Sequence, residues 1–280
     1  MPAIRSTLFL LFQIVTVVPV AFGCLLWSPL PRHWRYRLTM AWPRMVIWGA
    51  RIMLGIRHEV RGAGNLPDGP AILLSKHQST WETLFYPTYM PRELCYVFKR
   101  ELLYLPFFGW GIWLLDMIHI DRSKTNDAFE QVVRQGERKL AQRRWIIMFP
   151  EGTRTRVGSQ GRYKRGGARL AVRTGAPVVP IAVVGSDDQS PILADLKPLA
   201  RLLGLPGFPI TPTFPLLGPL GLLPYPVRYR IVYGEPIDLG DAHRGGRAED
   251  PKRLARLADR VQRRIQGLVN EHEGDGRARL

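Results

Sequence analysis

The chain has 280 residues, which is enough for one sizeable domain and an appendage. Its 40 Lys and Arg residues against 23 Asp and Glu give a formal charge of +17, so we expect an anionic partner. Two cysteines, Cys24 and Cys95, exclude a disulfide framework and a cysteine-based zinc cluster, and the sequence has no G-x-S-x-G, H-E-x-x-H or P-loop lysine motif. We therefore expect neither a metal ion nor a cofactor.

The first predicted element is an apolar helix from Leu8 to Trp27. Its 20 residues match the length that a helix needs to span a bilayer. The bulky, basic segment after it, Pro29 to Arg37, lacks the small-residue pattern of a signal-peptide cleavage site. Because arginines are more numerous after the helix than before it, the positive-inside rule predicts that the following domain is cytoplasmic. The apolar amino terminus also favours a membrane over a nucleic acid as the anionic partner.

A second apolar segment runs from Leu38 to Ile56 and carries Arg44 and Arg51. Seven residues apart, these arginines share one face of a helix, which suits a helix that lies in the membrane interface better than one that spans the bilayer. The alternative is a buried core helix whose two arginines extend to solvent.

The rest of the chain alternates between short apolar runs and amphipathic segments. The expected strands are Ala71–Ser75, Leu94–Phe98, Met117–Ile120, Trp145–Phe149, Val178–Val184 and Val227–Tyr233. The expected helices are Ser79–Tyr89, Asn126–Arg143, Tyr163–Thr174 and Pro251–His272. This rhythm predicts an α/β fold with a mostly parallel or mixed sheet covered by helices. We expect a membrane anchor over residues 1–57, the α/β domain over 58–273 and a frayed tail over 274–280.

Two apolar parts of this domain have no regular pattern. Residues 190–226 are rich in Leu, Pro and Gly, which argues against helix or central strand and predicts an insertion that covers a site for an apolar ligand, rests on the bilayer or packs on the domain's own core. The aromatic residues Phe107, Phe108, Trp110 and Trp113 either line a groove for an apolar ligand or pack in the core.

His77 is the first candidate catalytic residue, because it emerges at the end of the strand expected over Ala71–Ser75. A carboxylate bonded to one imidazole nitrogen fixes the tautomer, so that the other nitrogen can take a proton. Glu82 is the candidate carboxylate. Five positions are about 140° of helix rotation, so His77 must lie in the turn before the helix. Ser79 and Glu82 also have the form of a capping box, which is a purely structural alternative for Glu82.

A second motif, F-P-E-G-T-R, follows the strand expected over Trp145–Phe149. Pro150 and Gly152 indicate a loop at the end of this strand. The alternative to a functional loop is an ordinary turn beside a surface arginine, Arg154.

H-x-x-x-x-E together with F-P-E-G-T-R resembles the glycerolipid acyltransferase family, specifically the 1-acylglycerol-3-phosphate acyltransferases. Four family blocks occur in order between about residues 70 and 185, namely His77–Glu82, Tyr96–Arg122, Phe149–Arg154 and Val179–Ala182. Two positions depart from the family pattern. Glu82 stands where most relatives carry aspartate, and Asp116 stands where relatives often have a small residue such as glycine.

The resemblance implies that His77 acts as general base on the free hydroxyl of a lysophospholipid while Glu82 orients it. The hydroxyl then attacks the thioester carbonyl of an acyl donor, without a covalent acyl-enzyme. Positioned proton transfer typically contributes about 10²–10⁴-fold. The expected enzyme is an O-acyltransferase of phospholipid biosynthesis that converts lysophosphatidate to phosphatidate. Another lysolipid or a lipid A precursor is the alternative acceptor.

The phosphate of such an acceptor needs fixed cations. Arg122 and Arg154 are the candidates, because guanidinium groups bind phosphate oxygens bidentately. The other expected substrate-binding residues are Glu151, Gly152, Thr153 and Lys99. For Lys99, and for the weaker candidates Lys164 and Arg165, a solvated surface charge is an equal alternative.

The implied partners are the membrane bilayer, the lysophospholipid acceptor, and acyl-CoA or acyl-carrier protein as donor, with no nucleic acid. The implied location is the cytoplasmic face of the cell inner membrane. Relatives also suggest that the two amino-terminal segments form a hairpin in one leaflet, so both a span and a hairpin stay open. Two rival functions are a lipid hydrolase that uses Ser75 or Ser79 with His77, and a non-catalytic basic membrane-binding protein.

Overall fold

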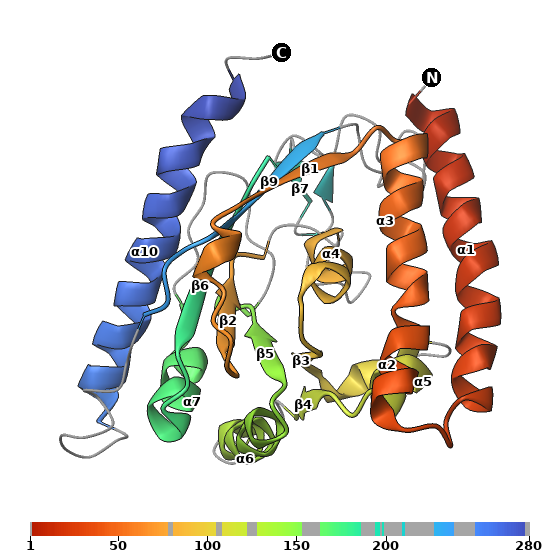
Figure 1. The fold of residues 1–280 in the computed structure, drawn as a ribbon. Helices are drawn as coiled ribbons and strands as arrows, with labels where there is room; N and C mark the ends of the chain where they lie inside the picture. Colours follow the sequence, from red (N-terminus) through yellow and green to blue (C-terminus); the bar gives the residue numbers. More distant parts are fainter. Residues whose placement is uncertain are drawn as a thin grey trace.

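The computed structural model describes residues 2–77, 81–104, 108–121, 128–152, 163–185, 194–196, 198, 209–210, 227–237 and 250–277. Within them the chain forms a mixed α/β structure with one large sheet and helices on both of its faces (Figure 1). Most of the insertion expected over residues 190–226 lies outside the described residues. The described part of it contains β7 (Ala194–Asp195) and β8 (Pro209–Ile210), which pair with each other in a separate two-stranded sheet.

The large sheet has seven strands in the order β1-β9-β6-β2-β5-β3-β4. Its strands are β1 (Arg57–Arg61), β2 (Ile72–Ser75), β3 (Leu94–Lys99), β4 (Ile118–Ile120), β5 (Trp145–Met148), β6 (Val178–Val184) and β9 (Arg228–Tyr233). Neighbouring strands are parallel except for β6 and β9, which pair in antiparallel fashion. The expectation of a mostly parallel or mixed sheet is therefore confirmed.

All six expected strands are present, and each end lies within one residue of its expected position. Strand β1, an edge strand that pairs with β9, was not expected from the sequence. Its residues are R-H-E-V-R, and only Val60 is apolar. An edge strand whose side chains contact solvent need not contain apolar residues, because its residues are not required to be buried. It therefore lacks the apolar pattern by which strands are predicted.

Alternation along the strands divides the core into two clusters. Leu73, Ile147 and Ile181 face the cluster that includes helices α3 (Ala41–Met53) and α4 (Trp81–Tyr89). Ile72 and Ile146 face the cluster on the other side, which is covered by α6 (Ala128–Ala141), α7 (Gly166–Thr174) and α10 (Pro251–Arg277). The central strands are buried on both faces, as their continuous apolar sequences require.

The expected helices are present with small differences at their ends. Helix α6 ends two residues earlier than expected, and α7 begins three residues later. The first two residues of the helix expected over Asn126–Arg143 lie outside the described residues. Helix α10 continues to Arg277, so the helix includes most of the segment expected to be a frayed tail. Helix α5 (Phe108–Leu114) and the short 3₁₀ helices η1 (Ala63–Asn65) and η2 (Arg100–Tyr104) were not expected.

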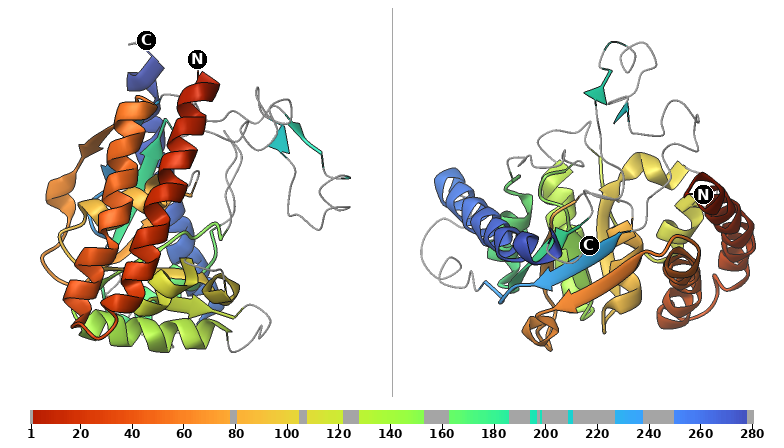
Figure 2. Two further views of the ribbon diagram at one scale, coloured as in Figure 1. Left: turned by 90° about the vertical axis from the view of Figure 1, so that its right-hand side faces the viewer. Right: turned by 90° about the horizontal axis from the view of Figure 1, so that it is seen from above.

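The amino-terminal segment forms three helices instead of two. Helix α1 (Pro2–Leu26) includes a 20-residue stretch, Thr7–Leu26, that is long and apolar enough to cross a membrane. Helix α2 (Arg32–Thr39) and α3 follow, and α3 returns alongside α1 (Figures 1 and 2). The two helices are joined by the Trp42 indole N–H, which donates to Thr16 Oγ1 at 3.2 Å. The expected single helix over Leu38–Ile56 is thus divided near Met40.

Candidate active site

His77 and Glu82 meet at the carboxyl end of β2. The chain leaves the strand after Ser75, and Glu82 returns in the first turn of α4. His77 Nδ1 lies 3.0 Å from Glu82 Oε1, and the Glu82 side chain is fully buried while that of His77 is 17% exposed. Because a carboxylate can only accept, Nδ1 carries the proton and Nε2 is left as the basic nitrogen. The two side chains therefore lie close together, as predicted. Ser79, the other residue of the alternative capping box, lies outside the described residues.

Phe149 fixes the plane of the His77 ring. The two rings stack with centroids 4.1 Å apart and 26° between their planes. Tyr96 of β3 continues the aromatic layer at 6.4 Å from Phe149, and its hydroxyl donates to the carbonyl of Thr83 in α4 at 2.7 Å. The imidazole is therefore held by stacking as well as by the carboxylate. Phe149 was not predicted to have a role of its own. The feature of the sequence that could have indicated this role is an aromatic residue at the end of a strand expected near the candidate base.

The loop after β5 lies beside the same histidine. Glu151 is 6% exposed, and its Oε2 accepts the backbone N–H of His77 at 3.3 Å. The Gly152 N–H donates to the Phe149 carbonyl at 2.9 Å, which closes a tight turn. Gly152 has φ of 72°, a conformation that glycine adopts without strain. The two sequence motifs thus meet, and Glu151 contacts the backbone that carries the predicted base.

Lys164 is a neighbour of this turn that the sequence identified only weakly. Its backbone N–H donates to the Pro150 carbonyl at 2.9 Å. Its side chain passes over Gly152 so closely that a Cβ on that glycine would lie 2.6 Å from the Lys164 Nζ. Any larger residue at position 152 would therefore displace an ammonium group from the strand-end loop.

Ser75, one of the two serines of the hydrolase alternative, is fully buried behind His77. Its hydroxyl lies 2.7 Å from the Tyr86 hydroxyl and also donates to the Lys76 carbonyl at 2.9 Å. Burial raises the pKa of Tyr86 above its ordinary value, so this phenol stays neutral. These contacts give Ser75 a structural role in the end of β2 and argue against a nucleophilic one.

The other predicted site residues divide into two groups. Lys99 ends β3 with an exposed side chain, at the same edge of the sheet as the end of β2. Arg122, Thr153 and Arg154 lie outside the described residues, so their placement beside the acceptor stays a prediction. Among the described residues, no group of three or more His, Cys, Asp or Glu side chains could hold a metal ion.

Asp116, the second departure from the family pattern, has a clear structural setting. Its φ is 50°, a left-handed conformation that Asp tolerates better than most residues. The buried Arg144 donates to its carbonyl at 3.1 Å and to that of Leu115 at 2.9 Å, and Lys139 forms an ion pair with its carboxylate. The aspartate therefore supplies the turn that a glycine would also allow, and it neutralises a buried cation as well.

The aromatic residues of α5 take positions that differ from one another. Trp113 is 70% exposed and lines a cavity of ≈ 460 Å³ along the edge strand β4, together with Phe98, Ile112 and His119. Trp110 lies beside Phe22 of α1, with ring centroids 6.1 Å apart. Core packing is therefore wrong for Trp113, and the cavity that it lines does not include His77 or Glu82. Phe107 is outside the described residues.

Residues 57–184, which include the histidine and the buried carboxylate at the end of β2, match the family model described as Acyltransferase. The chain is 47% identical over 184 residues to the 1-acyl-sn-glycerol-3-phosphate acyltransferase of Pseudomonas aeruginosa, with 64% of this chain and 70% of that protein covered. It belongs to the glycerolipid acyltransferase family, in the 1-acyl-sn-glycerol-3-phosphate acyltransferase group, and is an O-acyltransferase.

A second curated relative covers less of the chain, and a solved structure covers more of it. The human 1-acyl-sn-glycerol-3-phosphate acyltransferase alpha is 36% identical over 146 residues, which are 52% of each protein. The crystal structure of the 1-acyl-sn-glycerophosphate (LPA) acyltransferase PlsC from Thermotoga maritima superimposes with a TM-score of 0.65 over 95% of each chain at 20% identity. This likeness shows that the two proteins share a fold.

Proposed function

We propose that this acyltransferase moves a fatty acyl group from an acyl thioester to the free hydroxyl of lysophosphatidate and so forms phosphatidate. The observation that carries the proposal is the 3.0 Å contact between His77 Nδ1 and the buried Glu82, beside the Phe149–Gly152 turn. It occurs in a chain with 47% identity to a 1-acyl-sn-glycerol-3-phosphate acyltransferase.

In the proposed reaction, His77 Nε2 takes the hydroxyl proton as the acceptor oxygen attacks the thioester carbonyl. The tetrahedral intermediate collapses with cleavage of the carbon–sulfur bond, and the leaving thiolate receives the proton from the imidazolium. Glu82 stabilises that imidazolium, because its buried carboxylate faces Nδ1. These reaction steps do not require a covalent acyl-enzyme. The orientation of the two bound substrates supplies much of the remaining rate enhancement.

The acceptor phosphate is assigned to Arg154 and Arg122, with Thr153 and Gly152 lining the same loop and Lys99 at its edge. Glu151 was predicted to shape this pocket. Its contact with the His77 backbone N–H supports a different contribution, in which the carboxylate holds the turn that carries the base. The glutamine variant Glu151→Gln would keep that acceptor and is expected to retain more activity than Glu151→Ala.

We also infer attachment to one leaflet at the cytoplasmic face of the inner membrane, where acyl donors are made. Many apolar side chains of α1 are more than half exposed, including Leu8, Leu11 and Val15. Helix α1 packs along α3, and α3 packs on α4 of the α/β domain (Figure 1). A vertical span by α1 would therefore carry the charged domain into the bilayer, whereas a helix pair within one leaflet leaves the domain in water.

The direct test uses membranes that carry wild type, His77→Ala or Arg154→Ala, supplied with lysophosphatidate and a labelled acyl thioester. Phosphatidate formation is expected to fall about 10²–10⁴-fold in His77→Ala and to show a raised KM for lysophosphatidate in Arg154→Ala. Thermal unfolding in detergent serves as the control for folding. Wild-type turnover of another lysolipid, with none of lysophosphatidate, would overturn the substrate assignment.

A further inference from the structure

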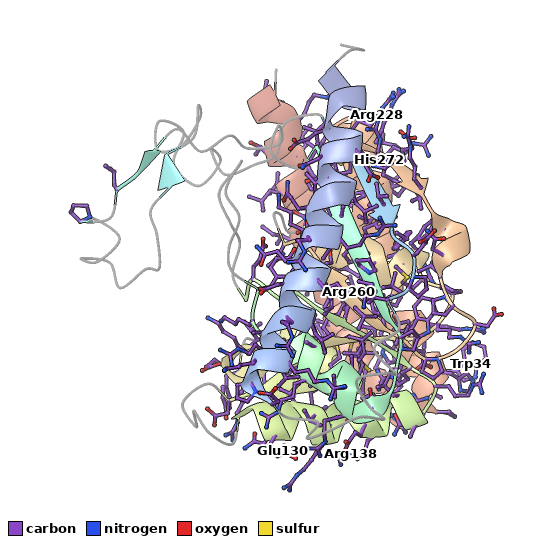
Figure 3. The ribbon with its side chains drawn as sticks, turned by 90° about the vertical axis from the view of Figure 1, so that its left-hand side faces the viewer. Trp34, Glu130, Arg138, Arg228, Arg260 and His272 are labelled. Carbon is purple, nitrogen blue, oxygen red and sulfur yellow. The ribbon has the colours of Figure 1, made fainter. Side chains whose placement is uncertain are left out.

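Helix α10 has a basic outer face that the proposed reaction does not use. Its inner face buries an apolar stripe against the sheet, which includes Leu254, Ala258, Val261, Ile265 and Leu268. The opposite face exposes four cations, Lys252, Arg256, Arg260 and Arg263, here called the α10 basic stripe. Figure 3 shows Arg260 on the side of α10 that is turned away from the sheet.

The charge of this stripe is not neutralised by the described part of the chain, where no ion pair joins any of its four side chains to an acidic residue. Asp259 shares the same face, so four cations and one carboxylate leave a net charge of +3. Like charges at i and i+4 of a helix repel each other. An anionic partner would remove this repulsion.

The position of the stripe argues against the membrane as that partner. Helix α10 covers the sheet face opposite to the one covered by α3 and α4. Figure 2, viewed from above, shows α10 on one side of the molecule and the pair α1 and α3 on the other. A flat bilayer that holds α1 and α3 cannot also touch the outer face of α10, so the stripe faces water.

The stripe also ends next to the candidate active site. Gln262, which precedes Arg263, accepts the backbone N–H of Tyr163 at 3.3 Å. Tyr163 is buried near Glu151, and burial first and the charge of Glu151 second raise the pKa of its phenol. Glu151 in turn accepts the N–H of His77. A partner on the stripe would therefore lie beside the strand-end loop.

We propose that the α10 basic stripe is the docking surface for an acidic acyl-carrier protein that presents the acyl thioester. This proposal rests on the proposed function, and it selects acyl-carrier protein over acyl-CoA as the donor. The four cations lie along a stretch of α10 from Lys252 to Arg263, which rises about 16 Å. That spacing fits the acidic side chains of a facing helix, whereas the compact phosphates of a free coenzyme A need an enclosing site. Charge complementarity of this kind raises the association rate and fixes orientation.

The test compares two donors, palmitoyl-carrier protein and palmitoyl-CoA, with lysophosphatidate as acceptor. The variant is Arg256→Glu with Arg260→Glu. Its matched control is Arg134→Glu with Arg138→Glu, which reverses two exposed arginines at the same spacing on α6. We expect kcat/KM for the carrier protein to fall at least about 10-fold in the variant, mainly through KM. Activity with palmitoyl-CoA should stay within about twofold, and the control should keep both activities.

A third variant, Arg256→Lys with Arg260→Lys, should use the carrier protein as well as wild type does, because the proposed docking depends on the positive charge of the stripe. Equal losses with both donors, or no loss with the carrier protein, would overturn the docking proposal. Wild-type activity with palmitoyl-CoA alone would also overturn it while the proposed function stands. Failure of wild type with both donors would remove the proposed function and this inference with it. Binding to anionic vesicles that is lost in the glutamate variant would reassign the stripe to lipid.

Discussion

The carboxyl end of β2 and helix α1 are both strongly apolar, but the molecule uses them in opposite ways. Every residue of β2 is at most 2% exposed, and the strand delivers His77 to a site built from buried contacts. Leu8, Leu11, Ile14 and Val15 of α1 are all more than half exposed. A hydrophobic sequence therefore forms protein core in one region and an exposed apolar surface, for which we propose lipid contact, in the other. Changes in the first region should alter chemistry or stability, and changes in the second should alter location.

The largest effect is expected from Glu82→Gln, which keeps the size of the side chain and removes its charge. The imidazolium that forms at His77 during catalysis would lose its counterion, so kcat should fall about 10²-fold with little change in KM. Thermal unfolding in detergent should change little, because an amide oxygen can still accept the Nδ1 proton. Activity within threefold of wild type would show that Glu82 is a capping residue and not part of the catalytic pair.

Val15→Asp tests the other half of the comparison. Val15 is 69% exposed on α1, and a charged side chain in a bilayer costs about 2.5–3.5 kcal/mol at its centre. The fraction of protein recovered in the soluble phase should rise at least about 10-fold, while activity on acceptor in detergent micelles stays near that of wild type. Asn270→Asp, the same charge on an exposed position of α10, is the control and should stay with the membrane. Equal release of both variants would contradict the lipid-facing assignment.

Asp116→Ala is expected to destabilise the fold by about 2 kcal/mol, because it leaves the buried Lys139 without its carboxylate partner and places alanine in a left-handed conformation. The measurement is denaturant or thermal unfolding in detergent. Asp116→Gly separates the two causes, since it relieves the backbone and still removes the charge. If the glycine variant is as stable as wild type, the ion pair contributes nothing.

Tyr86→Phe should have the smallest effect. It removes the buried hydroxyl contact with Ser75 at a cost of about 1 kcal/mol. Because Ser75 can still donate to the Lys76 carbonyl, the end of β2 keeps its shape and activity should fall less than about threefold. Loss of all activity with an intact fold would reopen the hydrolase alternative for Ser75.

The order of the apolar runs in the sequence determined the strands, since residues buried on both faces of a sheet must all be apolar and flanking polar residues mark where burial stops. His77, Glu82 and the Phe149–Arg154 motif could be proposed from the sequence, because their residue types and spacing resemble those of a known family, and the structure brings the described ones together. The role of Arg122, Thr153 and Arg154 in substrate binding stays a prediction from the sequence.

Tertiary structure alone decided the rest. The edge strand β1 exists only because β9 lies beside it, and the stacking of Phe149 on His77 joins two loops that are far apart in the chain. The contact of Glu151 with the His77 backbone and the pairing of Asp116 with Lys139 are of the same kind. Each depends on which strands are neighbours in the sheet, and that order follows from the summed packing of both faces, which no local pattern in the sequence encodes.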